Sequence, residues 1–350
     1  MRRASLVAAA WAIGLAAVAV PARADWLADA NARIERDRKA DLAVVVRDAA
    51  GNPVPGATVT LDQTASAFRW GTAVNSSYFV NTADVNNATY RQKLFTLFNQ
   101  ATLENDQKWV QWETPALRAN AVSTNNALLD RGFTVRGHTM VWQRRQSLPA
   151  DVVSALDNGD AATLRSRQLG HVAAIGGTRY NGRSLADWDV LNEQNANHLL
   201  TDVINPSAPK EQAPFLVEAF NAARAADPGA RLYVNDYNIL ASSNNTDTSA
   251  QRSMYDTVAY LKAQGAPVGG LGFQGHHASP NARTSGANLV TILDRFSTLG
   301  LPMLVTEFDM TGTGWASEQQ KADYMREFMT AVFSEKAVTG FSMWGFWDGK

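Results

Sequence analysis

The chain has 350 residues, of which 45% are hydrophobic and 19% are charged, and its formal net charge is -1. This composition is sufficient for one large α/β domain with a substantial core, and the near-neutral charge excludes a general electrostatic attraction to nucleic acid or anionic membranes. The sequence contains no cysteine, which excludes disulfides, thiol chemistry and cysteine-ligated metals.

The first 24 residues have the pattern of an export signal. Arg2 and Arg3 precede the apolar stretch 6–20, and Ala22-Arg23-Ala24 offers a cleavage site between small residues. The apolar stretch is short for a membrane span, so we expect residues 1–24 to be removed and no membrane anchor to remain. The predicted location is secreted or periplasmic, and either the Sec or the twin-arginine route remains open.

Residues 25–67 are expected to form an N-terminal extension. A helix is predicted over 26–39, followed by two β-rich runs, 42–46 and 57–61, which flank a turn rich in proline and glycine. We expect this β-hairpin to pack beside the main domain. The alternative is a small carbohydrate-binding module, although the segment is short and lacks an aromatic platform.

From Phe68 onward, strand and helix patterns alternate. The predicted strands are 68–74, 101–104, 134–142, 188–192, 231–236, 270–275, 302–307 and 340–345, with helices between them at 88–98, 164–174, 214–226, 251–263, 287–297 and 318–333. Eight such strands predict an α/β fold of the (β/α)8 TIM-barrel type over residues 68–350. A glycine-rich phosphate loop after the first strand would have favoured an open doubly wound sheet, and the sequence has none there. The sequence stops directly after the eighth strand, so we expect the final helix to be missing.

Two of these strands end on a glutamate. Trp188–Glu193 and Leu304–Asp309 are apolar runs that terminate in carboxylates. Since parallel barrel strands present their carboxyl ends on one face, Glu193 and Glu307 should meet at the barrel mouth. Strand alternation predicts that Glu307 and Asp309 share a side with residues 303 and 305. Paired carboxyls in one cleft are the equipment for breaking a glycosidic bond.

Polar and aromatic residues gather at other strand ends. Asn192 precedes Glu193, the second strand is followed by Glu104, Asn105 and Lys108, and tryptophans 142, 344 and 347 could stack on sugar rings or belong to the core. The adjacent histidines 276 and 277 should point to opposite faces and so not share a metal ion. We therefore expect no metal or cofactor, and a histidine bonded to a carboxylate instead.

Seven motifs in order resemble glycoside hydrolase family 10, the retaining endo-β-1,4-xylanases. They are Glu104-Asn105-Asp106-Gln107-Lys108-Trp109, Arg136-Gly137-His138-Thr139-Met140-Val141-Trp142, Trp188-Asp189-Val190-Leu191-Asn192-Glu193, Tyr233-Val234-Asn235-Asp236-Tyr237-Asn238, Gln274-Gly275-His276, Thr306-Glu307-Phe308-Asp309 and Trp344-Gly345. The resemblance implies a monomeric enzyme acting on xylan or xylo-oligosaccharides.

The resemblance also implies a role for each position. Glu193 would be the general acid/base and Glu307 the nucleophile, roughly 5 to 5.5 Å apart as in retaining enzymes. His276 would bond to Glu307 and Asp309, while Asn192 and Gln274 would hold the reacting sugar near its 2-hydroxyl. The residues implied on the non-reducing side are Glu104, Asn105, Lys108, His138, Trp142 and Trp344, with Trp347 as a further tryptophan over the sugar and Asn235 and Tyr237 nearer the leaving group.

The chain departs from the family pattern at three positions. Gln107 replaces the usual Met, Gln143 replaces the usual His, and Gly275 stands where Ser is common. Two other hypotheses remain beside the xylanase: a hydrolase of another β-1,4-glycan, and a non-hydrolytic xylan-binding protein. Hydrolysis of different polymers separates the first from a xylanase, and binding without release of reducing ends would identify the second.

Overall fold

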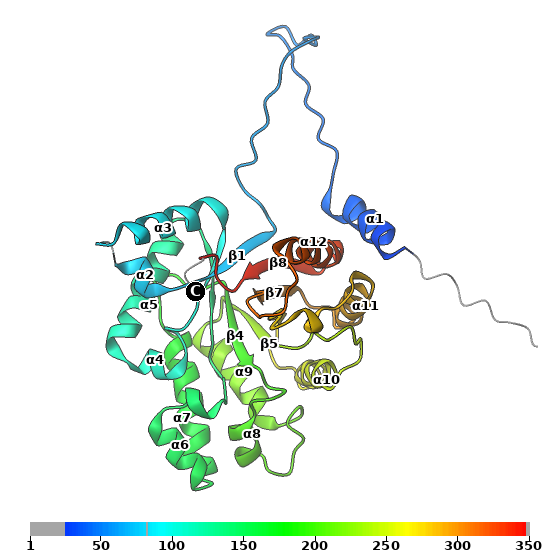
Figure 1. The fold of residues 1–350 in the computed structure, drawn as a ribbon. Helices are drawn as coiled ribbons and strands as arrows, with labels where there is room; N and C mark the ends of the chain where they lie inside the picture. Colours follow the sequence, from blue (N-terminus) through cyan, green and yellow to red (C-terminus); the bar gives the residue numbers. More distant parts are fainter. Residues whose placement is uncertain (1–24, 82, 348–350) are drawn as a thin grey trace, which may run out of the picture.

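A computed structural model describes residues 25–81 and 83–347, and its centre is a closed parallel barrel (Figure 1). The strands follow one another around the barrel in chain order, and the last strand pairs with the first. They are β1 (Arg69–Val74), β2 (Gln100–Leu103), β3 (Thr134–Gly137), β4 (Asp187–Asn192), β5 (Arg231–Asp236), β6 (Gly270–Phe273), β7 (Met303–Phe308) and β8 (Val338–Met343). The predicted (β/α)8 barrel is confirmed.

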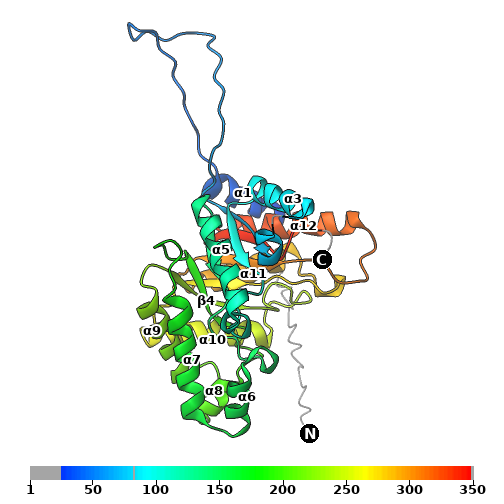
Figure 2. The same ribbon diagram turned by 90° about the vertical axis from the view of Figure 1, so that its left-hand side faces the viewer.

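Helices form the outer layer around the strands (Figures 1 and 2). They are α1 (Trp26–Arg38), α2 (Ser76–Val80), α3 (Val85–Leu97), α4 (Trp109–Glu113), α5 (Pro115–Asp130), α6 (Ala150–Asp157), α7 (Ala161–Gly176), α8 (Leu199–Ile204), α9 (Pro214–Ala226), α10 (Ser249–Ala263), α11 (Gly286–Ser297) and α12 (Glu318–Ser334), with 3-10 turns at Arg145–Ser147 and Pro280–Ala282. The predicted helices are present with bounds shifted by a few residues. Among the described residues, none after β8 forms a helix.

Periodic burial explains why these segments become helices against the barrel. In α11, Leu289, Ile292, Leu293 and Phe296 recur at helical spacing and are all fully buried. Ser285 caps the helix by accepting a hydrogen bond from the backbone N–H of residue 288 at 3.4 Å. Strand β4 is instead buried along its whole length, as expected for a parallel strand covered on both faces.

One close approach inside the barrel requires glycine. A Cβ atom on Gly137 in β3 would lie 2.1 Å from the Trp188 ring in β4, which real Cβ contacts do not tolerate. The absence of a side chain lets the indole fill the space between the two strands. This contact helps to set how β3 and β4 sit against each other, and both strands carry residues of the site.

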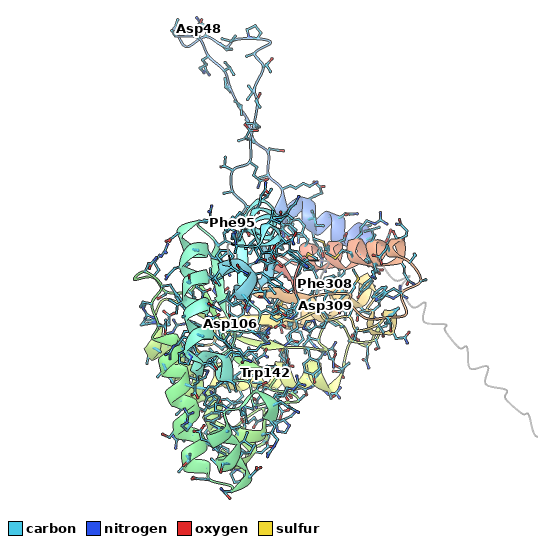
Figure 3. The ribbon with its side chains drawn as sticks, turned by 60° about the vertical axis from the view of Figure 1, so that its left-hand side comes forward. Asp48, Phe95, Asp106, Trp142, Phe308 and Asp309 are labelled. Atoms are coloured by element: carbon cyan, nitrogen blue, oxygen red, sulfur yellow. The ribbon has the colours of Figure 1, made fainter. Side chains whose placement is uncertain are left out.

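The N-terminal hairpin does not pack beside the barrel, so that expectation is wrong. Residues 40–67 form an arm that extends away from the body, with Asp48 at its tip (Figure 3), and its one antiparallel bridge joins Arg47 to Pro53. Leu42, Val45 and Leu61 are 71%, 64% and 65% exposed. Two short β-rich runs cannot bury both of their faces against each other, which explains why neither becomes a regular strand here.

The helix before the arm does pack on the barrel layer. Arg33 of α1 forms an ion pair with Asp294 of α11, and Arg38 donates to the backbone carbonyls of Phe333 and Val338 at 2.9 and 2.7 Å. No helix in the described part of the chain is long and apolar enough to cross a membrane. The predicted signal segment, residues 1–24, lies outside the described residues.

Candidate active site

Hydrogen-bonded amides link the two strand-end glutamates at the mouth of the barrel. The Gln274 Nε2 donates to Glu193 Oε1 at 3.1 Å and to Asn192 Oδ1 at 3.3 Å. The Asn235 Nδ2 donates to the same Asn192 Oδ1 at 2.9 Å and to Glu307 Oε1 at 2.8 Å. Side chains from β4, β5, β7 and the end of β6 thus bring both carboxyls to one polar site, which is what the two apolar runs predicted.

The backbone at Glu193 adopts an uncommon conformation. Its φ angle is 58°, in the left-handed region, which costs a non-glycine residue roughly 1–2 kcal/mol. The conformation is held because the Glu193 N–H donates to the Asn235 carbonyl at 2.9 Å and its own carbonyl accepts from the N–H of Asn197 at 2.8 Å. Strain of this kind gathers at functional positions, so this turn marks Glu193 as more than a strand end.

Glu307 is 4% exposed and lies beside a cation. The His276 Nε2 is 3.2 Å from Glu307 Oε2, and the His276 Nδ1 is 2.8 Å from Asp309 Oδ2. Burial lowers the pKa of His276, but the hydrogen bonds to Asp309 and Glu307 and the charges of these carboxylates raise it by more. The net pKa of His276 is about 10. For Glu307, burial raises the pKa, whereas the charge of His138 and the bond to His276 lower it by more, so that its net pKa is below the usual value.

Glu193 is surrounded by uncharged donors instead. Its Oε2 accepts from the Trp142 Nε1 at 2.8 Å and from the Asn197 Nδ2 at 2.7 Å, and its Oε1 accepts from Gln274. Within the described ranges no lysine, arginine or histidine forms an ion pair with Glu193. Two carboxyls of one site therefore have different partners: Glu307 has a cation, and Glu193 has neutral hydrogen-bond donors.

Buried charges continue below Glu307 into the barrel. The His138 Nδ1 is 3.0 Å from Asp189 Oδ2 and 3.9 Å from Glu307 Oε1. The other Asp189 oxygen accepts from Arg136, which is fully buried. Burial raises the pKa of Asp189, but the charge of Arg136 and the bond to His138 hold its net pKa below the ordinary value. Arg136 and Asp189 thus fix His138 against the carboxyl at the mouth.

The linkage of His276 to folding gives a testable pH dependence. Because its pKa in the folded protein, about 10, exceeds its ordinary value of 6.5, its contribution to stability is complete below pH 6.5 and is lost as pH rises through 10. We expect the free energy of unfolding to fall between pH 7 and 10, and the fall to be smaller in His276→Asn. Urea denaturation across this range measures it, with His198→Asn, at an exposed ion pair with Asp202, as the control. Identical pH slopes for all three proteins would contradict the assignment.

The residues implied on the non-reducing side lie along one part of the rim. The Lys108 Nζ donates to Asn105 Oδ1 at 2.9 Å and lies 5.1 Å from the centroid of the Trp142 ring and 6.0 Å from that of Trp344. Trp344 in turn meets the His138 ring edge-on at 5.4 Å. Lysine and two indoles therefore form one continuous surface beside the glutamates, suited to the apolar face and hydroxyls of a sugar.

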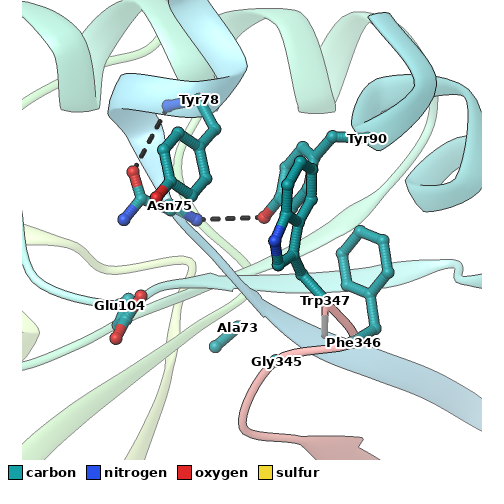
Figure 4. Close-up of a pocket in the computed structure, with 8 residues that line it drawn as sticks. All are labelled: Ala73, Asn75, Tyr78, Tyr90, Glu104, Gly345, Phe346 and Trp347. Atoms are coloured by element: carbon teal, nitrogen blue, oxygen red, sulfur yellow. Dashed lines mark hydrogen bonds between the residues drawn. The ribbon is translucent and has the colours of Figure 1, made fainter. Parts of the chain in front are cut away.

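Glu104 and Trp347 line a separate pocket at the same rim (Figure 4). Trp347 stacks on Tyr78 with ring centroids 5.5 Å apart and packs at 5.6 Å from Tyr90. The Tyr90 hydroxyl accepts from the backbone N–H of Asn75 at 3.1 Å. Trp347 thus packs against α2 and α3, and the pocket that it lines together with Glu104 offers an aromatic wall and a carboxylate.

Tyr237 is half-buried and follows the end of β5. Its backbone N–H donates to Asp236 Oδ1 at 2.9 Å, and the other Asp236 oxygen accepts from the N–H of Asn195 at 3.1 Å. Burial above all, and then the nearby Glu193 charge, raise the pKa of Asp236 to about 7. Asp236 thereby joins the loop after Glu193 to the end of β5.

One detail of the sequence interpretation changes, and a second is confirmed. Strict alternation in β7 does not extend to its end, because the register with β8 shifts between Val305 and Phe308, and the consecutive side chains of Thr306 and Glu307 both bond to Asn235. The adjacent histidines do diverge as predicted: His277 packs on Phe308 and its Nε2 is 2.9 Å from the Tyr324 hydroxyl. No group of three or more potential metal ligands occurs among the described residues.

The sequence interpretation missed Arg136, Asp189, Asn197 and Thr306 as parts of this site. Arg136 lies in β3, two residues before His138, and Asp189 stands inside an apolar strand, so charged residues within buried strands could have revealed them. Asn197, four residues after Glu193, had no comparable signal, because the turn that returns it to the carboxyl depends on the left-handed backbone.

The departures at Gln107 and Gln143 are accommodated by hydrogen bonds. Both amides are buried; Gln107 donates to the Tyr180 hydroxyl at 3.1 Å and accepts from the His138 N–H at 3.4 Å. Gln143 donates to the Thr201 hydroxyl at 2.8 Å and accepts from the Thr201 N–H at 2.7 Å. Each replacement therefore leaves the adjacent His138 or Trp142 anchored.

Comparison with known proteins gives one family match and many relatives. The model of Glycosyl hydrolase family 10 matches residues 60–350. The chain is 30% identical over 328 residues to the anti-sigma-I factor RsgI6 of Acetivibrio thermocellus, covering 92% of this chain and 39% of that protein. It is 27% identical over 318 residues to endo-1,4-beta-xylanase 1 of Arabidopsis thaliana (90% and 31%), and 32% identical over 264 residues to endo-1,4-beta-xylanase 1 of Humicola insolens (72% and 57%).

Solved structures agree with the fold. The intracellular xylanase TsXylA of Thermoanaerobacterium saccharolyticum has a TM-score of 0.64 at 26% identity, with 80% of this chain and 86% of that chain covered. Native xylanase 10B of Thermotoga maritima has a TM-score of 0.64 at 23% identity, with 80% and 83% covered. The curated relatives are longer proteins: the chain spans 39%, 31% and 57% of the three named above.

Proposed function

Since the chain belongs to glycosyl hydrolase family 10, we propose that it is an endo-acting hydrolase that cleaves internal β-1,4-xylosidic bonds of xylan with retention of configuration. The observation that carries the proposal is the pair of glutamates joined through Gln274, Asn192 and Asn235, one beside a cation and the other among neutral donors. Similarity to curated xylanases supports xylan as the substrate. A structure of a TsXylA mutant in complex with xylotetraose supports xylo-oligosaccharide binding at such a site.

The first half of the proposed reaction forms a glycosyl-enzyme ester. A Glu307 oxygen attacks the anomeric carbon while protonated Glu193 donates its proton to the glycosidic oxygen, and the carbon–oxygen bond to the leaving chain breaks. Glu307 suits the attack because His276 keeps it ionised. On Glu193, Oε2 accepts two hydrogen bonds, from Trp142 and Asn197, whereas Oε1 accepts one, from Gln274, so Oε1 is the oxygen assigned to proton exchange.

The second half returns the enzyme to its starting state. Ionised Glu193 takes a proton from water, the water oxygen attacks the anomeric carbon, and the ester bond to Glu307 breaks. Two displacements at one carbon give net retention. Asn192 and Gln274 would hold the reacting sugar near its 2-hydroxyl as positive charge develops at the ring. Asn235, implied nearer the leaving group, is instead fully buried and donates to Asn192 and Glu307.

We extend the proposal to the remaining rim and to export. Lys108, Trp142 and Trp344 would bind sugars on the non-reducing side, together with Glu104, Asn105, His138 and Trp347, and Tyr237 would contact the leaving chain.

The protein would act as a monomer outside the cytoplasm after loss of residues 1–24. The basic start and the apolar stretch of that segment support export.

Hydrolysis of defined polymers tests the function. The mature chain should release xylo-oligosaccharides from linear xylan, lower its viscosity early as an endo-acting enzyme does, and give initial products of β-configuration by NMR. Cleavage of β-1,4-glucan in preference to xylan would favour the other polymer hydrolase. Binding to xylan without release of reducing ends would instead favour the non-hydrolytic alternative.

A further inference from the structure

We infer that Arg144 binds the carboxylate of a uronic-acid branch on the xylan chain, beside Glu193, and so makes acidic xylan the preferred substrate. The inference rests on the proposed function, which it narrows from xylan in general to xylan with charged branches. Three observations support it. Of two adjacent arginines, only Arg145 has an anionic partner among the described residues; Arg144 contacts a tryptophan of the site; and a xylan chain can carry carboxylates on its branches.

Arg144 and Arg145 are both exposed, but only one has an anionic partner. Arg145 makes two hydrogen bonds to Asp157, at 2.7 and 2.6 Å. Across residues 25–81 and 83–347, the Arg144 guanidinium has neither a hydrogen bond nor an ion pair. The chain therefore supplies a carboxylate to one arginine and leaves the next one available to a carboxylate from outside.

The position of Arg144 is set by the site itself. Its Cζ lies 5.8 Å from the centroid of the Trp142 ring, and the Trp142 Nε1 donates to Glu193 at 2.8 Å. Gln143, between them, is buried, pairs with His198 through the backbone, and holds Thr201 with both ends of its amide. The main chain before Arg144 is thus anchored. Trp142 contacts both the Arg144 guanidinium and Glu193.

The field of Arg144 also reaches the neighbouring strand end. Tyr237 follows β5, and its pKa is raised by burial and by the charges of Glu193 and Asp236, while the positive charge of Arg144 opposes this rise. Arg144 is therefore near enough to the end of β5 for its positive charge to act there.

The chemistry of xylan identifies the ligand class. The β-1,4-xylose backbone is neutral, so a carboxylate can come only from a uronic-acid branch. A guanidinium binds a carboxylate through two parallel N–H donors, which gives directional as well as electrostatic selectivity. An exposed arginine at the rim suits a branch, because the backbone occupies the cleft between the glutamates and the branch extends toward solvent.

The test compares one polymer with and without its charge. We measure kcat/KM on glucuronoxylan and on the same polymer after chemical reduction of its carboxyls to primary alcohols, which keeps the branch and removes the charge. The wild-type ratio should be about two- to fivefold in favour of the acidic polymer, the size expected of a partly exposed charge pair. The ratio should approach one in Arg144→Gln and stay at the wild-type value in Arg145→Gln.

Salt gives a second readout that a purely structural role would not move. At 1 M salt the Debye length is about 3 Å, so the wild-type preference should disappear, and Arg144→Gln should show no salt-dependent preference. A wild-type ratio of one, or an Arg144→Gln ratio equal to wild type, overturns the inference and leaves the proposed function standing.

Binding separates this inference from the proposed function. In the Glu307→Ala background, calorimetry compares a glucuronosyl xylo-oligosaccharide with its carboxyl-reduced form. If the wild-type chain hydrolyses neither polymer, the proposed function fails, and tighter binding of the acidic form that Arg144→Gln abolishes still supports the inference. Equal affinities for both forms overturn it.

Discussion

Glu307→Ala is expected to lower kcat on xylan by roughly 10⁵-fold while xylo-oligosaccharide binding is retained. The carboxyl is proposed to form the covalent bond to the anomeric carbon. Asp309 also bonds to His276, but no other carboxylate among the described residues bonds to both His276 and Asn235. The sugar contacts proposed for the rim tryptophans do not involve Glu307, so affinity should change little. Reducing-end release measures kcat, and calorimetry with xylotetraose measures binding.

An external nucleophile distinguishes this role from general damage to the site. In Glu307→Ala, azide should enter the space left by the carboxyl and attack in one displacement, giving an α-xylosyl azide and partial recovery of activity on an activated aryl glycoside. Glu218→Ala is the matched control, since Glu218 pairs with Arg165 on the outer helices, and it should keep full activity. A Glu307→Ala enzyme that keeps most of its activity on xylan would remove Glu307 as the nucleophile.

Glu193→Ala is expected to affect two substrates very differently. Cleavage of xylan should slow by about 10²- to 10⁴-fold, because the departing sugar alkoxide needs a proton. An aryl xylobioside with an acidic phenol as its leaving group needs little protonation, so its first step should remain fast. The intermediate should then accumulate, since water lacks its general base, and stopped-flow absorbance should show a burst of phenolate equal to the enzyme concentration.

Azide provides the complementary check at this position. In Glu193→Ala it should attack the intermediate from the face where water normally enters, giving a β-xylosyl azide, the opposite anomer from that expected of Glu307→Ala. Glu218→Ala again serves as the control. Equal losses on xylan and on the activated aryl substrate, without a burst, would argue against the acid/base role of Glu193.

Much of this architecture was predictable because it depends on local pattern. Apolar runs of strand length alternate with helical periodicity from Phe68 onward, and the eight strands follow the predicted order around the barrel. The expectation that Glu193 and Glu307 share one mouth followed from barrel geometry alone, since parallel strands end on the same face. The divergence of His276 and His277 was predicted from the alternation of adjacent residues in a strand, and it holds although β6 ends at Phe273, before both histidines.

The arm at residues 40–67 shows where local pattern misleads. Its runs of valine and leucine have the composition of strands, yet they remain exposed and make one bridge, Arg47 to Pro53. A strand requires a neighbour to satisfy its backbone groups and a surface on which to bury one face. Neither requirement can be evaluated from the segment itself, so composition predicted strands that the fold does not provide.

By itself, the sequence determined the barrel and the two glutamates at its mouth, because these follow from periodicity and from the ends of strands, whereas the histidine beside Glu307 was implied only by the resemblance to the family. The tertiary structure alone decided which charges meet: Arg136 on Asp189, Asp189 on His138, and a carboxylate for Arg145 but none, among the described residues, for Arg144. Electrostatic interactions depend on distances of a few ångströms between residues far apart in the chain. Those distances are set by strand register and by turns such as the left-handed backbone at Glu193, which no local pattern encodes.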